Sequence, residues 1–160
     1  MEAMRLVTTL LLLALAQPAA AADCQALDEE ALRAIKPLMV LRNRQASDQF
    51  TPDGRWRGES PVSAEVERRF YSILADRSPS GDQALVYLLT VYMGEHPGEE
   101  LICEAANRGK RLIPLIRSYS KCQPLVGAEP LHKFVQGSGV LPVDAIQAIE
   151  SGSRCSWDEP

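Results

Sequence analysis

The sequence lacks the motifs that many enzymes of this size depend on. No serine lies in a G-x-S-x-G elbow, because Gln136 stands two residues before Ser138. The glycines on either side of Ser138 lack the lysine and the following helix pattern of a phosphate-binding loop. The chain has no C-x-x-C pair and only two histidines, which argues against a zinc site. We therefore expect no cofactor and no bound metal.

Strong positive charge and long apolar runs are also missing. The formal net charge of −4 argues against a nucleic-acid partner and against binding to a strongly anionic membrane surface. After Ala22 no segment is long and apolar enough to anchor the chain in a membrane. No segment alternates apolar and polar residues with a period of two, so we expect no sheet and predict an all-α fold.

The N-terminus has the pattern of a secretory signal peptide over residues 1–22. Arg5 supplies the positive end, Leu6 to Ala16 form an apolar core, and Ala20 to Ala22 provide small residues for cleavage. This core is too short to span a bilayer, which takes about 20 residues. Asp23 stands where a lipoprotein signal has a small residue, which disfavours lipidation of the next residue, Cys24.

Cleavage after Ala22 leaves 138 of the 160 residues, enough for a single helical domain over residues 23–160. The short, alanine-rich signal indicates a periplasmic location, and an extracellular one fits the same features. Export makes two disulfides the expected state of the four remaining cysteines, which are Cys24, Cys103, Cys122 and Cys155.

Helix geometry disfavours one of the three possible cysteine pairings. If two helices fold back at Gly109, Cys103 and Cys122 are offset along the helix axes by about 10 Å. A disulfide needs Cα atoms within about 7 Å of each other. We favour Cys24–Cys103 with Cys122–Cys155, and the pairing Cys24–Cys122 with Cys103–Cys155 stays open.

The densest apolar run after the signal spans residues 84–93 and is interrupted only by Thr90. A helix that is apolar on all sides has no solvent face, so we expect it to be the central buried helix. Ser80 and Gln83 match a capping box at its start, and Gly94 with Pro97 should end it.

Helical spacing predicts about five helices in all. One covers residues 27–44, with a kink or break at Pro37, and the next covers residues 63–76 with Ser63 as its cap. The helix at residues 97–108 should break at Gly109, and Pro114 favours a late start or a short 3₁₀ turn in the next. A long loop at residues 45–62 separates the first two of these helices. Residues 124–160 are expected to be loosely structured apart from a short helix at residues 143–150.

Leu74 to Pro79, running into Gln83 to Leu85, is similar to the turn between the helices of HEAT-type repeats. Lys36-Pro37-Leu38 and Ile113 to Ile116 resemble the Pro-Leu of the first helix in such repeats. The resemblance covers about half of the chain after the signal, and no clean repeat period is visible. It implies stacked helical hairpins with a protein-binding surface and transfers no catalytic residue. An irregular helical bundle is an equal alternative.

Two basic clusters are candidates for binding. Arg55-Trp56-Arg57, in the long loop, has the composition of an interface hot spot, although Trp56 could instead pack back onto the helices. The second cluster lies at the Gly109 break and could equally be a solvated turn; its members are Arg108, Lys110 and Arg111.

A third cluster is acidic and surrounds His96. Glu95, Glu99 and Glu100 could make an acid–base or metal site with it, although carboxylates at a helix N-terminus are also explained by the helix dipole. We therefore expect a non-catalytic exported protein that binds another protein, in the manner of small inhibitors or immunity proteins. A small secreted hydrolase that uses the acidic residues, or a carrier of a small ligand, is the alternative.

All four cysteines are expected to be oxidised. Thiol labelling of the unreduced, denatured protein should therefore be blank, and reduction should lower the melting temperature, because one disulfide contributes about 2–4 kcal/mol. Labelling of two or more cysteines would contradict the two predicted disulfides.

Overall fold

The computed structural model describes residues 26–91, 97–119, 122–124, 134–136 and 143–152. The proposed signal peptide and the Gly94 helix stop lie outside these ranges. The described residues form six α-helices, one 3₁₀ turn and a two-stranded ribbon, which confirms the all-α prediction. In chain order the elements are α1 (Glu29–Gln49), α2 (Ser63–Ala75), α3 (Pro79–Val91), α4 (Pro97–Arg108), η1 (Lys110–Leu112), α5 (Ile113–Tyr119), β1 (Cys122–Pro124), β2 (Phe134–Gln136) and α6 (Val143–Ser151).

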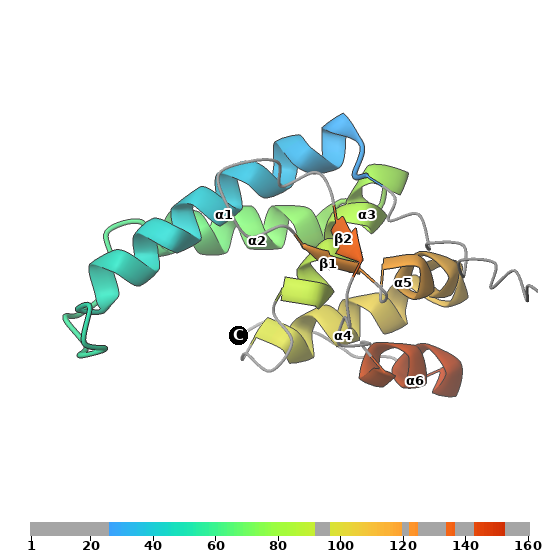
Figure 1. Cartoon of the computed structure of the whole chain (residues 1–160). Helices are drawn as coiled ribbons and strands as arrows, with labels where there is room; N and C mark the ends of the chain where they lie inside the picture. The colour runs from blue at the N-terminus through green and yellow to red at the C-terminus, as the bar shows by residue number, and fades with distance from the viewer. Residues whose placement is uncertain (1–25, 92–96, 120–121, 125–133, 137–142, 153–160) are drawn as a thin grey trace, which may run out of the picture.

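Helix α3 is the centre of the fold, as its composition predicts. It contacts α1, α2, α4, α5 and β1 (Figure 1). Six consecutive residues, Ala84 to Leu89, are each no more than 1% exposed. Every face of this stretch is therefore covered by neighbouring elements. Within the described residues no helix combines the length and the apolarity needed to cross a bilayer.

Helix α1 is longer than predicted. It continues through Pro37 and ends only at Gln49, so of the expected kink or break at the proline the break is wrong, and the loop begins at residue 50. A proline inside a helix costs about 3 kcal/mol. Ile35 and Leu38, which flank it, are both completely buried, and their packing offsets this cost.

The first half of α1 lies on the bundle, whereas its second half runs away from it together with the start of α2 (Figure 1). We call residues 39–66 the arm. Ser60 is the only residue of the arm that is buried. The arm therefore has no apolar core of its own, although Met39 and Val66 at its base pack against the main core.

The start of α3 differs from the predicted capping box. Its cap is Ser78, whose Oγ accepts a hydrogen bond from the amide of Gly81 at 3.0 Å, and Pro79 occupies the first helical position. A Cβ on Gly81 would lie 2.3 Å from the carbonyl oxygen of Asp76, so only glycine fits this turn. The expected cap residue Ser80 is displaced into the interior and bonds elsewhere.

Ser80 and Gln83 instead connect α3 to the start of α1. The Ser80 hydroxyl donates to Asp28 Oδ2 at 2.7 Å, and Gln83 both donates to that oxygen and accepts from the Asp28 amide, each at 3.0 Å. Asp28 also caps α1 by accepting from the amide of Ala31 at 2.7 Å. Partial burial acts to raise the pKa of Asp28, but these hydrogen bonds outweigh it, and the pKa is lowered.

The predicted cap of α2 is also wrong. Val62 precedes that helix without a capping side chain, and the Ser63 hydroxyl accepts hydrogen bonds from Gln45 and Gln49 of α1. A polar group that could satisfy its own helix is thus used to hold the two helices of the arm together.

Arg108 joins three helices at one buried point. Its guanidinium, which is fully buried, pairs with Glu104 at 2.9 Å and with Asp82 at 2.8 Å. It also donates to the carbonyl oxygen of Leu74 at 2.9 Å and to that of Ile73 at 3.4 Å. The C-terminal carbonyls of α2, the first turn of α3 and the end of α4 are therefore held by one side chain.

The helices after Arg108 follow the sequence pattern closely. Gly109 has a φ of 79°, which ends α4, and η1 then leads into α5 with Pro114 in its first turn, as predicted. Helix α6 packs on α4 through Ala145 and Ile149. The ribbon of β1 and β2 was not expected, because strands of three residues are too short to show an alternating pattern.

Cys103 on α4 is disulfide-bonded. Its partner lies outside the described side chains, because Cys24 and Cys155 are in undescribed segments and the side chain of Cys122 is not described. The pairing scheme and the second disulfide stay predictions.

The buried leucines of α3 should dominate stability. We expect Leu88→Ala or Leu89→Ala to lower the free energy of unfolding by about 2–5 kcal/mol each, since both leave a cavity in the centre of the core. Chemical denaturation measures this loss. A loss below about 1 kcal/mol for both variants would show that α3 is not the core.

The Arg108 cluster gives a second stability prediction. Arg108→Met should cost about 3–5 kcal/mol, because the Glu104 carboxylate, 2% exposed, keeps only the half-exposed Arg77 as an ion-pair partner among the described residues, and the carbonyls of Ile73 and Leu74 lose a donor. Arg111→Met is the matched control, because Arg111 pairs with the same Asp82 but its side chain is 52% exposed. The control should cost less than about 1 kcal/mol. Equal losses for the two variants would refute the buried joint.

Candidate functional site: the tip of the helical arm

The arm ends in a short hairpin, residues 50–57, which we call the tip (Figure 1). The amide of Thr51 donates to the Arg55 carbonyl at 2.8 Å, and the amide of Arg57 donates to the Gln49 carbonyl at 2.7 Å. Gly54 allows the reversal, because its φ of 81° is a conformation that other residues rarely adopt. The TPDG sequence thus forms a defined turn at the end of α1.

This hairpin pairs two aromatic residues across the turn. Phe50 and Trp56 form an isolated antiparallel bridge, and their rings meet edge to face with centroids 5.3 Å apart. Trp56 is 58% exposed and Phe50 is 44% exposed. Together with Val40, 65% exposed, they are three of the five large apolar side chains that are exposed among the described residues. The arm thus carries more of these exposed large apolar side chains than the rest of the described chain.

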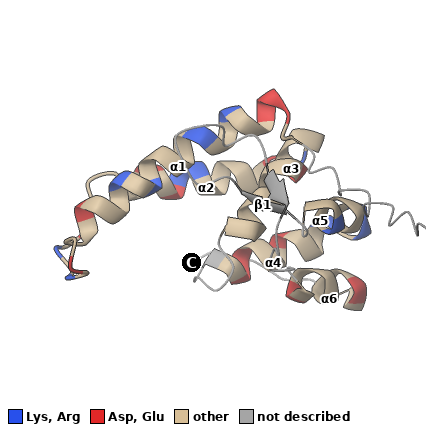
Figure 2. Ribbon diagram, in the orientation of Figure 1, with Lys and Arg blue, Asp and Glu red and all other residues tan. Residues whose placement is uncertain are grey.

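Charges of both signs surround the aromatic pair (Figure 2). Arg55 pairs with Asp53 at 3.0 Å, and both side chains are exposed. For Arg57 the described residues provide no carboxylate within ion-pairing distance, although its amide belongs to the hairpin. Of the two arginines that flank Trp56, Arg55 is therefore ion-paired, whereas Arg57 has no ion-pair partner among the described residues.

Polar contacts beneath the tip fix its position on the arm. The Ser60 hydroxyl donates to Asp48 Oδ2 at 2.6 Å and also accepts from the amide of Val62 at 3.3 Å. Arg44 lies 3.8 Å from the same Asp48 carboxylate. These bonds tie the segment that follows the tip to the last turn of α1. The hairpin is therefore held at both of its ends, by α1 before it and by Ser60 after it.

The structure separates the second basic cluster from this site. Arg108 is buried in the joint described above, so its guanidinium is not on the surface where a binding role would need it. Arg111 is exposed and pairs with Asp82 at 3.1 Å, and Lys110 lies beside a hollow between α4 and α6. This cluster is at the junction of α4 and α5, away from the tip (Figure 1).

The acidic cluster is described only in part. Glu95 and His96 lie outside the described residues, whereas Glu99 is exposed and Glu100 accepts a hydrogen bond from Tyr71 at 3.3 Å. Partial burial and the Glu100 carboxylate raise the pKa of Tyr71. Over the described ranges no three side chains of His, Cys, Asp or Glu are grouped so that they could hold a metal ion.

Sequence reasoning found Trp56 and its arginines but missed Phe50. The signal was available, because Phe50 and Trp56 bracket the TPDG turn as a cross-strand pair would. The pair was missed because the loop was predicted to begin at residue 45. Phe50 then lay inside a long loop and not directly after the end of a helix, where a hairpin would start.

Comparisons with known proteins found no family model, no curated protein and no solved structure with significant similarity to this chain. They therefore transfer no activity, ligand or partner to the chain. The function proposed below rests on the residues of the arm.

Proposed function

We propose that this protein is an exported, non-catalytic helical protein that binds another protein through the tip of its arm. The observation that supports this proposal is the exposed pair of Phe50 and Trp56 on a hairpin at the end of the arm. Tryptophan and arginine are the side chains that most often dominate interface energetics, and both occur in Arg55-Trp56-Arg57. The proposed location is the periplasm or the extracellular space.

The pairing of the two rings matters as much as their exposure. A side chain that is free to rotate loses about 0.5–1.5 kcal/mol when a partner immobilises it. Trp56 is already held by its backbone bridge and by the edge of Phe50, 5.3 Å away between centroids. Much of this ordering cost is thus met during folding, which is how a small surface can supply useful affinity.

The shape of the arm supports the same role. An element with a single buried residue adds little to the core, yet it carries aromatic side chains away from the bundle. We therefore assign the arm the role of presenting the tip to a partner. A hydrolase acting through Glu99 and Glu100 has less support, because Glu99 is exposed and Glu100 bonds to the phenol of Tyr71.

The stability of Trp56→Ala is the first prediction of this proposal and needs no knowledge of the partner. We expect a loss of under about 1.5 kcal/mol, the value of one aromatic pair, because the side chain is 58% exposed. A buried tryptophan would cost about 3–5 kcal/mol. Urea denaturation separates the two outcomes, and a loss in the higher range would place Trp56 in the core and remove the proposed site.

The second measurement tests the binding role of the same variant. A partner is first isolated by co-purification from the native compartment and identified, and its affinity for purified variants is then measured. Trp56→Ala should weaken binding by about 2 kcal/mol or more, a factor of about thirty. Val40→Ala is the matched control, because Val40 is an equally exposed apolar residue of the arm that lies outside the tip. Unchanged affinity in Trp56→Ala would refute the proposal.

A further inference from the structure

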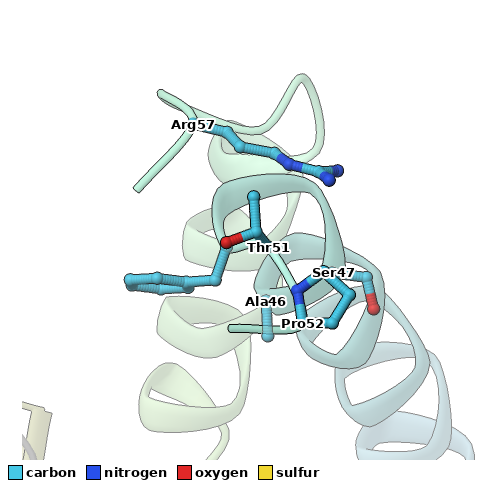
Figure 3. A pocket seen from close by; sticks show the side chains of 6 residues that line it. Ala46, Ser47, Thr51, Pro52 and Arg57 are labelled. Carbon is cyan, nitrogen blue, oxygen red and sulfur yellow. The ribbon is translucent and has the colours of Figure 1, made fainter. Parts of the chain in front are cut away.

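A surface hollow lies directly beside the aromatic pair. It has a volume of about 430 Å3, and its lining residues are Ala46, Ser47, Phe50, Thr51, Pro52 and Arg57. In Figure 3 Arg57 extends across one side, with Thr51 beneath it and Ala46, Ser47 and Pro52 on the other. The volume lies in the lower part of the range of about 300–1,000 Å3 for ligand pockets, so one or two side chains of a partner would fit.

The walls of the hollow are of two kinds. Ala46, Pro52 and the ring of Phe50 offer apolar surface, whereas Arg57 offers a charged, planar donor group. Among the described residues Arg44 lies 3.8 Å from Asp48 and Arg55 pairs with Asp53, whereas no carboxylate lies within ion-pairing distance of Arg57. The hollow therefore combines an apolar floor with a guanidinium whose charge has no counterpart there.

We propose that this hollow binds a peptide segment of the partner in which a carboxylate side chain lies next to an apolar side chain. The carboxylate takes both donors of the Arg57 fork, which suits planar, bidentate binding of an acid. The apolar side chain rests on Phe50 and Pro52. This inference rests on the proposed function and adds the chemistry of the segment that the tip recognises.

An anionic membrane surface fits the tip less well than an acidic peptide. Attraction to anionic lipid grows with each basic residue near the surface, by about 1 kcal/mol each. At the tip Arg55 is neutralised by Asp53, and Glu59, also exposed, follows closely. One uncompensated arginine is sufficient for a single carboxylate but not for a charged surface.

A random peptide library displayed on phage tests the inference on the full mature chain. Native protein should enrich peptides with Asp or Glu adjacent to Leu, Phe or another large apolar residue. Arg57→Glu should lose these peptides and enrich Lys or Arg at the same position. Circular dichroism checks that the variant is folded; the hairpin bond of Arg57 uses its backbone amide, which is retained.

The best peptide is then synthesised and its affinity is measured by titration. Arg57→Gln, and equally a Glu→Gln change in the peptide, should weaken binding about tenfold or more. Arg33→Gln is the control, because Arg33 is an exposed arginine of the same helix, α1, that lies outside the arm and does not line the hollow. Its affinity should stay within about twofold of the native value.

Three outcomes would overturn the inference: no enrichment, enrichment without an acidic residue, or the same peptides on native protein and Arg57→Glu. Arg57-dependent sedimentation with phosphatidylglycerol vesicles in place of peptide binding would also overturn it, in favour of a membrane. If the isolated partner needs Trp56 but binds Arg57→Gln unchanged, the inference fails and the proposed function stands. If the partner binds Trp56→Ala unchanged, the proposed function itself fails.

Discussion

The buried guanidinium of Arg108 is the interaction on which the rest of the bundle depends. Burying a charge costs several kcal/mol, and the cost is recovered only when every donor finds a partner. Each of the three guanidinium nitrogens of Arg108 has a partner, and the partners are two carboxylates and two backbone carbonyls drawn from three helices. None of these partners can move without exposing the others, so the end of α2 and the start of α3 are fixed relative to each other. Because α2 also forms one side of the arm, the direction in which the arm leaves the bundle is set at this joint.

The arm follows a different physical rule. The hydrogen bond from Gln45 to Ser63 joins its two helices, and the bond from Ser60 to Asp48 ties the connecting segment to α1, where apolar burial is almost absent. Such bonds contribute about 1 kcal/mol each, because the same groups bond to water when the protein unfolds. They specify geometry more than they add stability. A rigid base and a lightly stabilised end are suited to a protein that presents a small aromatic surface while its stability comes from elsewhere.

Much of the fold could be predicted from the sequence, and the failures share a cause. Helix limits set by local chemistry were right, as at Gly109 and at Pro97. The caps predicted at Ser80 and Ser63 were wrong, and the burial of Arg108 was not predicted, because each side chain bonds across the fold to a residue that a local pattern does not contain. Ser80 reaches Asp28, 52 positions away. The candidate site was predicted in part for the same reason. The composition of Arg55-Trp56-Arg57 indicated Trp56, whereas its pairing with Phe50 and the hollow beside Arg57 form only when the hairpin folds.

Pro37 has a mechanical consequence for the arm. It lies where α1 leaves the bundle, next to Leu38, the last completely buried residue of that helix. Proline removes one backbone hydrogen bond of the helix, and kinks in helices concentrate at such positions. The eleven residues from 39 to 49 span about 16 Å at 1.5 Å per residue. A tilt of about ten degrees at Pro37 would carry the tip through about 3 Å, the size of a side chain, so the hydrogen bonds that join α1 to α2 determine how closely the tip keeps its position.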